Sequence, residues 1–198
     1  MGESEHEDIG LVTRIRSGDM AAFERLYNKY KRPLYQTALA ITGDRGAAEE
    51  VMQDCFVRAH RAMGRVVASG SLSPWLHRIA VNLACNWANR HRRWLSALDV
   101  WLEHLSAPGL APEQAAEQVE VGEVVRQALG SLNSTQRAVI VLFYVHGFTL
   151  AELAYIMDCP VGTVKSRLHY ACKAFRERLR QDARLPGEII YGTELGKA

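Results

Sequence analysis

Apolar residues recur at three- and four-residue steps along most of the chain, and no stretch alternates between apolar and polar residues. This spacing is typical of amphipathic helices and predicts an all-α protein. The pattern is most regular between Thr149 and Leu179. Thr149 and Glu152 have the spacing of a capping box, and Pro160 separates two apolar runs because proline cannot continue a helix. The stretch therefore predicts two helices joined by a tight turn.

The second helix of this pair has one apolar stripe and an opposite polar side. The stripe consists of Val161, Val164, Leu168, Ala171, Phe175 and Leu179. The polar side and its flanks carry Thr163, Lys165, Ser166, Arg167, His169, Tyr170 and Lys173. A helix in the DNA major groove needs cations for phosphates and short polar side chains for base edges. An ordinary amphipathic helix explains the composition equally well, but the tight turn favours a DNA-binding helix-turn-helix.

Four helices are expected in the first half of the chain. The spacing predicts them over 9–16, 20–43, 45–63 and 74–94, with Pro33 kinking or splitting the second helix. Asp19, Asp44 and Ser73 are placed as N-caps, and Gly43 as a left-handed helix end. Residues 64–73 are small and predict a loop. In the second half, helices are expected over 121–132 and 134–146 before the helix-turn-helix, with Asn133 or Ser134 as the N-cap of the second.

The helix over 74–94 has a row of amides and guanidiniums opposite its predicted apolar side. The apolar side consists of Leu76, Ile79, Ala80, Leu83 and Trp87. The polar row consists of Arg78, Asn82, Asn86, Asn89, Arg90, Arg92 and Arg93. Asn and Arg both hydrogen-bond base edges, so the row predicts a nucleic-acid face. The nearby tryptophans can stack on an unpaired base, although core packing is the stronger explanation for them.

The helix over 45–63 has acidic and amide residues in its first half and arginines near its end. The polar residues of the first half are Glu49, Glu50, Gln53 and Asp54. This order suits the helix dipole, so helix stability alone explains it as well as a partner-binding surface does.

Charge is distributed unevenly, although the net charge of the 198 residues is only +2. Residues 1–93 hold 14 Lys or Arg against 10 Asp or Glu, which gives +4. Residues 94–123 hold six acidic residues and no basic ones, and residues 124–182 hold eight basic against four acidic, which gives +4. Two basic blocks separated by an acidic strip predict two small DNA-facing helical domains on a flexible linker. We divide the chain into a first domain (1–93), an acidic linker (94–119), a last domain (120–182) and a tail (183–198).

Other chemistry finds little support in the sequence. The four cysteines form no CxxC pair, and His169 with Cys172 is an isolated pair of metal-ligand type, so we expect no metal and no cofactor. There is no paired-carboxylate, nucleophile–base or phosphate-loop pattern, so we expect no enzyme and no small-molecule substrate. The acidic N-terminus lacks an apolar segment and the longest apolar run, 138–145, is too short to cross a bilayer, which predicts a cytoplasmic protein without membrane insertion.

Three segments resemble bacterial RNA polymerase sigma factors of the extracytoplasmic-function (ECF) group. Residues 156–171, IMDCPVGTVKSRLHYA, resemble the helix-turn-helix that binds the minus-thirty-five promoter element. Residues 47–59, AAEEVMQDCFVRA, resemble the segment that docks on the core polymerase, which implies contacts by Glu50, Gln53 and Asp54. Residues 75–93 resemble the helix that grips the minus-ten element, and Asn82 falls on the family asparagine near the extruded base.

The chain departs from the family pattern at two places. Tyr170 and Cys172 stand where basic residues are usual, and Val66, Val67 and Ala68 stand where aromatic and charged residues are frequent. The resemblance implies binding to core RNA polymerase, promoter DNA and an anti-sigma factor that restrains the protein. The alternative is a stand-alone helix-turn-helix repressor, which usually dimerises on two half-sites. No dimerisation heptad is apparent, and a repressor does not need the amide row of the first domain.

Overall fold

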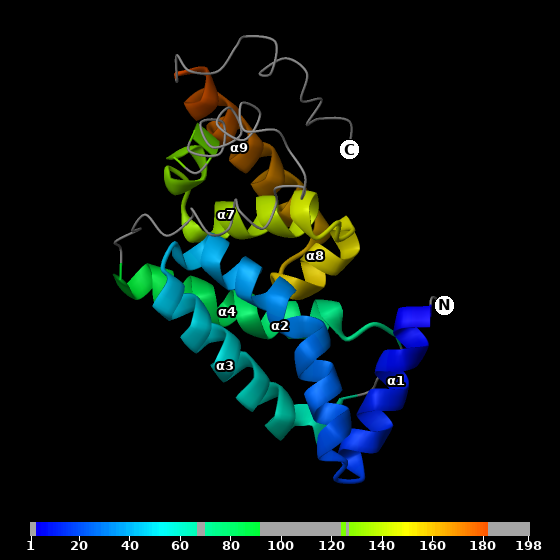
Figure 1. Cartoon of the computed structure of the whole chain (residues 1–198). Coiled ribbons are helices and arrows are strands. Elements are labelled where there is room, and N and C mark those ends of the chain that lie inside the picture. The colour runs from blue at the N-terminus through cyan, green and yellow to red at the C-terminus, as the bar shows by residue number, and fades with distance from the viewer. Residues whose placement is uncertain (1–2, 67–69, 92–123, 126, 182–198) are drawn as a thin grey trace, which may run out of the picture.

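The computed structural model describes residues 3–66, 70–91, 124–125 and 127–181, and every element assigned in these ranges is helical. This confirms the all-α prediction. The linker (94–119), the tail (183–198), Arg92 and Arg93 lie outside the described residues. The first domain contains α1 (Glu3–Arg16), α2 (Met20–Thr42), α3 (Arg45–Ala62), the short 3₁₀ helix η1 (Met63–Arg65) and α4 (Ser73–His91) (Figure 1).

Local hydrogen bonds fix the predicted helix boundaries of the first domain. The Asp19 carboxylate accepts a hydrogen bond from the Ala22 amide at 3.1 Å, and the Asp44 carboxylate accepts one from the Ala47 amide at 2.7 Å. Gly43 ends α2 with a φ of 67°, a left-handed conformation that glycine adopts without steric cost. These three caps confirm the boundaries at 19 and at 43–44.

One prediction for this domain needs correction, and the structure selects a bend over a break from the two alternatives at Pro33. Helix α1 begins at Glu3 rather than near residue 9, because its first turns pack through charged groups that leave no apolar period. Helix α2 is not split at Pro33 but continues to Thr42, and its ribbon changes direction along its length (Figure 1). A proline costs a helix one hydrogen bond and bends it without ending it when packing holds both halves.

The first domain is held by a core between α1, α2, α3 and α4. Buried side chains from each helix meet there; they include Leu11, Leu26, Leu34, Phe56 and Leu76. Phe23 and Tyr27 of α2 pack against Phe56 of α3, with ring centroids 6.4 and 4.7 Å apart. Burial of apolar and aromatic side chains is the main stabilising term for such a small bundle.

The last domain begins, within the described residues, with helical residues 124–125 and 127–130, followed by α7 (Ser134–Ile140). Asn133 and Gln136 cap α7 reciprocally, which selects Asn133 from the two predicted caps. The predicted single helix over 134–146 changes at Val141 into a π-helical turn, η2 (Val141–Val145), before Gly147 ends it with a φ of 70°. Helices α8 (Leu150–Ile156) and α9 (Val161–Arg180) complete the domain.

The two domains are packed directly on each other. In Figure 1, α7 and α8 lie against α2 and α4 of the first domain. One continuous apolar cluster contains side chains of both domains, among them Leu39, Ile41, Val81, Leu142 and Leu153. The sequence predicted two modules on a flexible linker, whereas the described parts of both domains share one core. We call the surfaces that meet between the domains the docking interface.

Candidate nucleic-acid and polymerase interfaces

The helix-turn-helix is shaped by hydrogen bonds between residues close in sequence. The Glu152 amide donates to the Thr149 hydroxyl at 3.2 Å, and the Thr149 amide donates to the Glu152 carboxylate at 2.8 Å, which confirms the capping box. Asp158 turns the chain with a φ of 50°, and α9 starts where the Val164 amide donates to the Pro160 carbonyl at 3.1 Å. The predicted pair of helices and its turn are therefore confirmed.

Helix α9 buries one side and leaves the other open, as its apolar stripe predicts. Val164, Leu168 and Ala171 are buried in the shared core, whereas Val161 lies at the edge and is 40% exposed. The exposed residues on the predicted DNA-facing side are Lys165, Ser166, His169, Tyr170 and Lys173. Tyr170 is the most exposed large apolar side chain of this helix, at 64%.

Two of the predicted DNA-binding residues on α9 are half-buried, Thr163 and Arg167. The Thr163 carbonyl accepts a hydrogen bond from the Ser166 hydroxyl at 3.0 Å. An Arg167 guanidinium nitrogen lies 3.5 Å from the Cys159 sulfur, so Arg167 also supports the turn. The Ser166 oxygen keeps lone pairs that can accept a further hydrogen bond, because a hydroxyl is both donor and acceptor.

Helix α4 carries three of the predicted minus-ten residues on its exposed side, Asn82, Asn86 and Arg90. They are four residues apart, so they lie on one face of the helix. Asn89, adjacent to this row, accepts a hydrogen bond from the Ser134 hydroxyl of α7 at 3.0 Å. The open face of α4 therefore borders the last domain.

Arg78, unlike the other described residues of this row, has its guanidinium hydrogen-bonded to the helix-turn-helix. Its guanidinium donates to the Asp158 carboxylate at 2.8 Å and to the Tyr155 carbonyl at 3.0 Å, both in the last domain. It also lies 5.0 Å from the centre of the Tyr155 ring. In the docked arrangement the predicted minus-ten residue Arg78 thus binds the turn of the helix-turn-helix.

A second side of α4, adjacent to the predicted apolar stripe, faces the docking interface. His77, Val81 and Ala84 are buried there, whereas the predicted core residues Ile79, Leu83 and Trp87 are only half-buried. The predicted apolar side is confirmed for Leu76 and Ala80, and Ile79 and Leu83 pack against the same core while half-buried. A second buried side exists because α4 is covered by its own domain on one side and by the last domain on the other.

Two histidines meet at the docking interface. The His77 ring lies 4.9 Å from the His146 ring and 4.8 Å from the Phe148 ring. His77 Nδ1 donates to the Ser73 carbonyl at 2.8 Å, and within the described residues its buried Nε2 has no hydrogen-bond partner. Burial lowers the pKa of His77 to about 3 and that of His146 to about 4, so both rings are neutral in the docked state.

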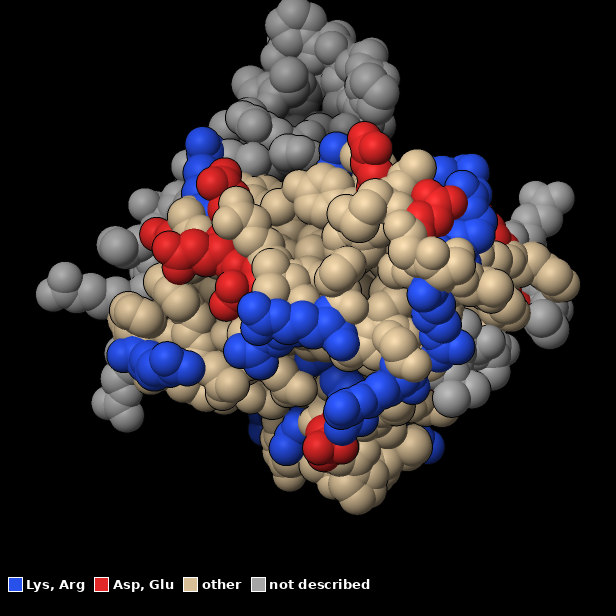
Figure 2. All heavy atoms as spheres, turned by 90° about the horizontal axis from the view of Figure 1, so that it is seen from below, with Lys and Arg blue, Asp and Glu red and all other residues tan. Residues whose placement is uncertain are grey.

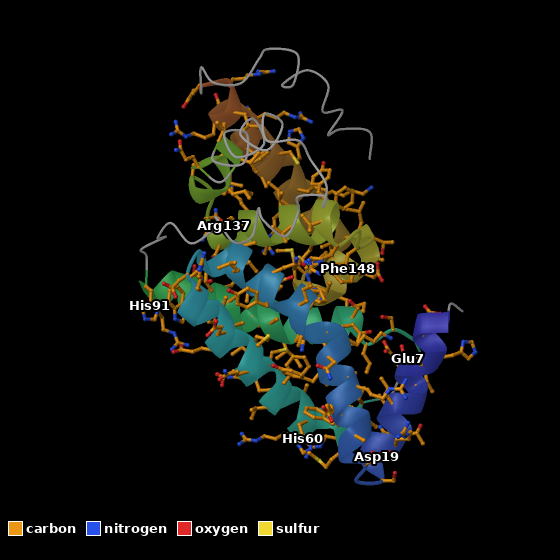
Figure 3. All side chains as sticks on the ribbon, viewed as in Figure 1. Glu7, Asp19, His60, His91, Arg137 and Phe148 are labelled. Atoms are coloured by element: carbon orange, nitrogen blue, oxygen red, sulfur yellow. The ribbon has the colours of Figure 1, made fainter. Side chains whose placement is uncertain are left out.

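Arg137 of α7 stabilises the docking interface at a second place, near the end of α2. This side chain is 5% exposed and donates to the Ile41 carbonyl of α2 through Nε at 3.1 Å and Nη2 at 2.7 Å. It also donates to the Leu132 carbonyl at 2.6 Å. Burial lowers its pKa to about 10, which leaves it charged at neutral pH. Figure 3 shows Arg137 and Phe148 where the last domain meets the first.

The predicted polymerase-binding residues Glu50, Gln53 and Asp54 are all exposed on α3. Ala47, Ala48 and Val51 on the other side of α3 are buried in the core, so the side with the predicted polymerase-binding residues faces solvent. Figure 2 shows Lys and Arg side chains across much of the face of the molecule seen from below, with Asp and Glu side chains at several places around them.

Within the described residues there is no group of three or more His, Cys, Asp and Glu side chains placed to hold a metal ion. Burial raises the pKa of the Cys55 thiol to about 12 and also raises that of Cys85, so both thiols are protonated at neutral pH. No helix in the described part of the chain is long and apolar enough to span a bilayer.

Comparison with known proteins identifies the family. Residues 26–94 match the family model of sigma-70 region 2, and residues 122–175 match that of sigma-70 region 4. The chain is 34% identical to the ECF RNA polymerase sigma factor SigM of Mycobacterium tuberculosis over 98% of its own length and 92% of the relative. The chain belongs to the ECF family of RNA polymerase sigma factors. A further ECF sigma factor, SigW of Bacillus subtilis, is 32% identical over 85% of the chain and 95% of the relative.

Two solved structures have a fold similar to that of this chain. The structure of CnrH in complex with the cytosolic domain of CnrY has a TM-score of 0.66 at 24% identity, and covers 89% of this chain and 99% of that one. The sigma factor RpoE of Bartonella quintana, solved with the anti-sigma factor NepR, has a TM-score of 0.58 at 22% identity, and covers 81% and 98%. The matches to both regions do not favour the alternative of a stand-alone repressor.

Sequence reasoning missed His77, His146 and Arg137 as residues that join the two domains of this ECF sigma factor. One signal for His77 was available. His77, Val81 and Ala84 recur at four- and three-residue steps directly beside the predicted stripe, which is the spacing of a second buried side. Arg137 carried no such signal, because nothing in the sequence pairs a lone arginine with the carbonyl of Ile41.

Proposed function

We propose that this ECF sigma factor uses α3, α4 and α9 as three separate binding surfaces. Helix α3 would bind core RNA polymerase, α4 would hold one strand of the minus-ten element, and α9 would bind the minus-thirty-five element in the major groove. The observation that carries the proposal is the capped helix-turn-helix whose second helix presents its polar side to solvent. The residue ranges 1–93, 94–119, 120–182 and 183–198 remain our division of the chain.

On α9 we assign different roles to cations and to short polar side chains. Lys165, Arg167 and Lys173 would contact phosphates, and Thr163, Ser166, His169 and Tyr170 would face base edges. Phosphate contacts supply affinity that falls with salt, whereas contacts to base edges supply sequence preference. The exposed hydroxyl, imidazole and phenol of this face can each donate and accept hydrogen bonds.

On α4 we assign the minus-ten strand to Arg78, Asn82, Asn86, Arg90, Arg92 and Arg93. The exposed amides of Asn82 and Asn86 support this role, since an amide can bond a base edge with two groups at once. Arg78 can contact DNA only after it leaves Asp158 and Tyr155. We therefore propose that the two domains separate when the sigma factor joins polymerase and promoter.

On α3 we assign core polymerase binding to Glu50, Gln53 and Asp54. Their exposure on a helix whose opposite side is buried supports a contact with a second protein. Binding both promoter elements through one polymerase raises the effective concentration of the second contact, so neither domain needs tight affinity alone.

The remaining assignments follow from this function. A sigma factor of this kind catalyses no reaction and takes no small-molecule substrate, and it acts in the cytoplasm where chromosome and polymerase are. Similar folds have been solved with an anti-sigma factor or with the cytosolic domain of CnrY. We include an anti-sigma factor among the partners.

The direct test is run-off transcription with core polymerase on a promoter library. The protein should form a complex with the core enzyme and start transcripts at defined sites. Substitution of Ser166 or His169 should change which upstream sequences are used, because these residues face base edges. A chain that forms no complex and starts no transcript, or Ser166 and His169 variants that lose equally on every promoter, would contradict the proposal.

The phosphate contact of α9 is tested with Lys165→Ala. Binding to a minus-thirty-five duplex should weaken on all sequences, and the slope of log affinity against log salt should fall by about 1. The matched control is Arg178→Ala, which removes an exposed cation from the last turn of the same helix. An unchanged slope in the Lys165 variant would exclude a phosphate contact there.

A further inference from the structure

Helix α1 holds both ends of the connection between α3 and α4. At the start of this connection, Arg16 Nε donates to the Met63 carbonyl at 3.2 Å, and Arg16 Nη2 donates to the Val66 carbonyl. At the end of the connection, the Asp8 carboxylate accepts a hydrogen bond from the Leu72 amide at 2.8 Å. These contacts join residues 47 to 64 positions apart in the sequence. We call this set of hydrogen bonds the loop clamp.

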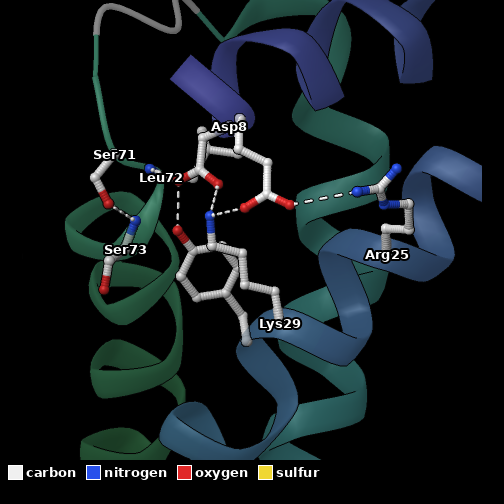
Figure 4. Close-up of polar contacts among 8 residues, drawn as sticks. Asp8, Arg25, Lys29, Ser71, Leu72 and Ser73 are labelled. Carbon is white, nitrogen blue, oxygen red and sulfur yellow. Dashed lines mark hydrogen bonds and ion pairs between the residues drawn. The ribbon is translucent and has the colours of Figure 1, made fainter. Parts of the chain in front are cut away.

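The Asp8 side of the loop clamp is completely buried and fully hydrogen-bonded. Asp8 is 0% exposed, and its carboxylate also accepts hydrogen bonds from the Tyr30 hydroxyl and from Lys29 Nζ, the latter at 2.7 Å (Figure 4). A buried carboxylate is tolerated only when it is paired and hydrogen-bonded, and here three donors surround it. Burying the Asp8 carboxylate beside the loop therefore costs desolvation energy. If α1 were needed only for packing, it would not require a carboxylate at this position.

Charged neighbours reinforce this contact. Burial acts to lower the pKa of Lys29, but its hydrogen bonds to Asp8 and Glu7 outweigh that effect and raise the pKa. Glu7 lies 2.8 Å from Lys29 Nζ and 3.6 Å from Arg25. Figure 4 shows Asp8 between α1, α2 and the chain that enters α4. The network fixes the carboxylate, and through it the backbone of Leu72.

Leu72 is the last residue before α4, and its carbonyl accepts the first hydrogen bond of that helix, from the Leu76 amide at 2.9 Å. A carboxylate at this position accepts a hydrogen bond from a backbone N–H that the helix itself cannot pair. Its negative charge also interacts favourably with the positive end of the helix dipole. The clamp thus sets where α4 begins relative to α1 and α2. It also sets where the chain leaves η1, through Arg16.

We infer that Asp8 and Arg16 are positioning residues for capture of the minus-ten strand, an inference that rests on the proposed function of α4. They touch no DNA themselves. They hold the two ends of the connection and the start of α4, so that the amide row beginning at Asn82 stands in one orientation before DNA arrives. Preorganisation of this kind raises affinity by reducing the entropy cost of orienting a binding surface when its ligand arrives.

The test uses full-length sigma factor assembled with core polymerase. The probe is a single-stranded oligonucleotide carrying the minus-ten sequence of a promoter that gives a run-off transcript. Arg16→Ala and Asp8→Asn should each weaken its binding roughly tenfold, the effect of losing about one charge-assisted hydrogen bond. Arg16→Lys keeps the charge and one donor, and should recover part of the loss.

Two further measurements separate positioning from a general loss of structure. Affinity for core polymerase and binding of a minus-thirty-five duplex should remain at wild-type level in both variants. The matched control is Arg14→Ala, which removes a guanidinium of the same helix that binds only Asp19, at 2.7 Å, among the contacts described. This control should leave oligonucleotide binding unchanged.

Each outcome bears on the inference. If Arg16→Ala and Asp8→Asn bind the oligonucleotide as wild type does, the clamp has no positioning role. If core affinity and duplex binding fall by the same factor as oligonucleotide binding, the effect is structural and the inference is wrong. If wild-type holoenzyme itself does not bind the oligonucleotide, it is the proposed function of α4 that fails.

Discussion

The loop clamp and the docking interface are formed by different kinds of side chain. The loop clamp of α1 joins its partners through charged groups, Asp8, Lys29 and Arg16. The docking interface joins the two domains through apolar side chains, two neutral imidazoles and one arginine that donates to backbone carbonyls. The first contact is fully paired within one domain, whereas the second contains a ring nitrogen without a partner in the described residues.

The difference indicates which contact is built to separate. A buried carboxylate that loses three donors is strongly destabilised, so the loop clamp stays closed while the domain is folded. Neutral imidazoles regain water and protons when the docking interface opens, which offsets part of the loss of apolar contact. We therefore expect the domains to part while the first domain stays intact.

Removing the Arg137 guanidinium is the largest test of the docking interface. Arg137→Ala leaves the Ile41 carbonyl near the end of α2 without its two described donors, and should cost about 2–4 kcal/mol of unfolding free energy. Urea unfolding measures this loss. Arg137→Lys should recover little, because a lysine cannot form the same fork. Arg61→Ala, an exposed arginine on α3, is the control and should change stability by less than about 0.5 kcal/mol.

Acid should open the docking interface. The pKa values of His77 and His146 are about 3 and about 4 in the docked state, below the ordinary value of 6.5. The docked state therefore binds fewer protons, so docking is at full strength above pH 6.5 and weakens as pH falls toward 4. At pH 5 the loss is on the order of 2 kcal/mol for each ring that regains its ordinary pKa on separation.

Small-angle scattering between pH 8 and pH 4.5 measures this opening as an increase in radius of gyration. His77→Leu should make the dependence shallower, since one titrating ring is removed. His169→Gln, which changes an exposed histidine on α9, should leave it as it is. A radius that stays constant to pH 4.5 would show that the histidines do not control docking.

Tyr30→Phe examines the other contact. It removes the hydroxyl that donates to Asp8 while keeping the ring, and should cost about 1–2 kcal/mol of unfolding free energy. The pH dependence of domain separation should be unchanged, because Tyr30 lies outside the docking interface. Tyr170→Phe, on a ring that is 64% exposed, controls for loss of a phenol. A change in docking with Tyr30→Phe would mean that the two contacts are coupled.

Arg78→Ala should have the smallest effect on docking. The Asp158 partner is 73% exposed, and exposed ion pairs contribute about 0.2–1 kcal/mol. Scattering at low and high salt measures the change, with wild type losing the same small amount at high salt. The same variant should weaken minus-ten strand binding in the holoenzyme. If Arg78→Ala weakened the free energy of docking by well above about 1 kcal/mol, Arg78 would be a main stabilising contact of the docking interface.

The helix-turn-helix was predictable because everything that shapes it is local. The capping box of Thr149 and Glu152, the stop at Pro160 and the stripe through Leu168 are all visible at spacings of three or four residues. The exposed row of α9 follows directly from that stripe. The same reasoning predicted the caps at Asp19, Asp44 and Asn133.

The faces of α4 and the start of α1 were not predictable in this way. A single-stripe pattern assigns one buried side, but α4 is covered by two domains, so His77 and Ala84 are buried beside the predicted stripe and outside it. Helix α1 begins with charged residues whose partners, Lys29 and the Leu72 amide, are more than twenty positions away. Charge pairing over such separations leaves no periodic trace in a sequence.

The docking interface also has a consequence for how the protein is made. Its hydrogen bonds join residues 45 to 109 positions apart, whereas the capping box of the helix-turn-helix spans three. During synthesis the first domain therefore emerges from the ribosome with the surface around His77 and Ile41 still uncovered. We expect this nascent surface to be the part of the chain that chaperones engage, until translation of α7 and α8 supplies its cover.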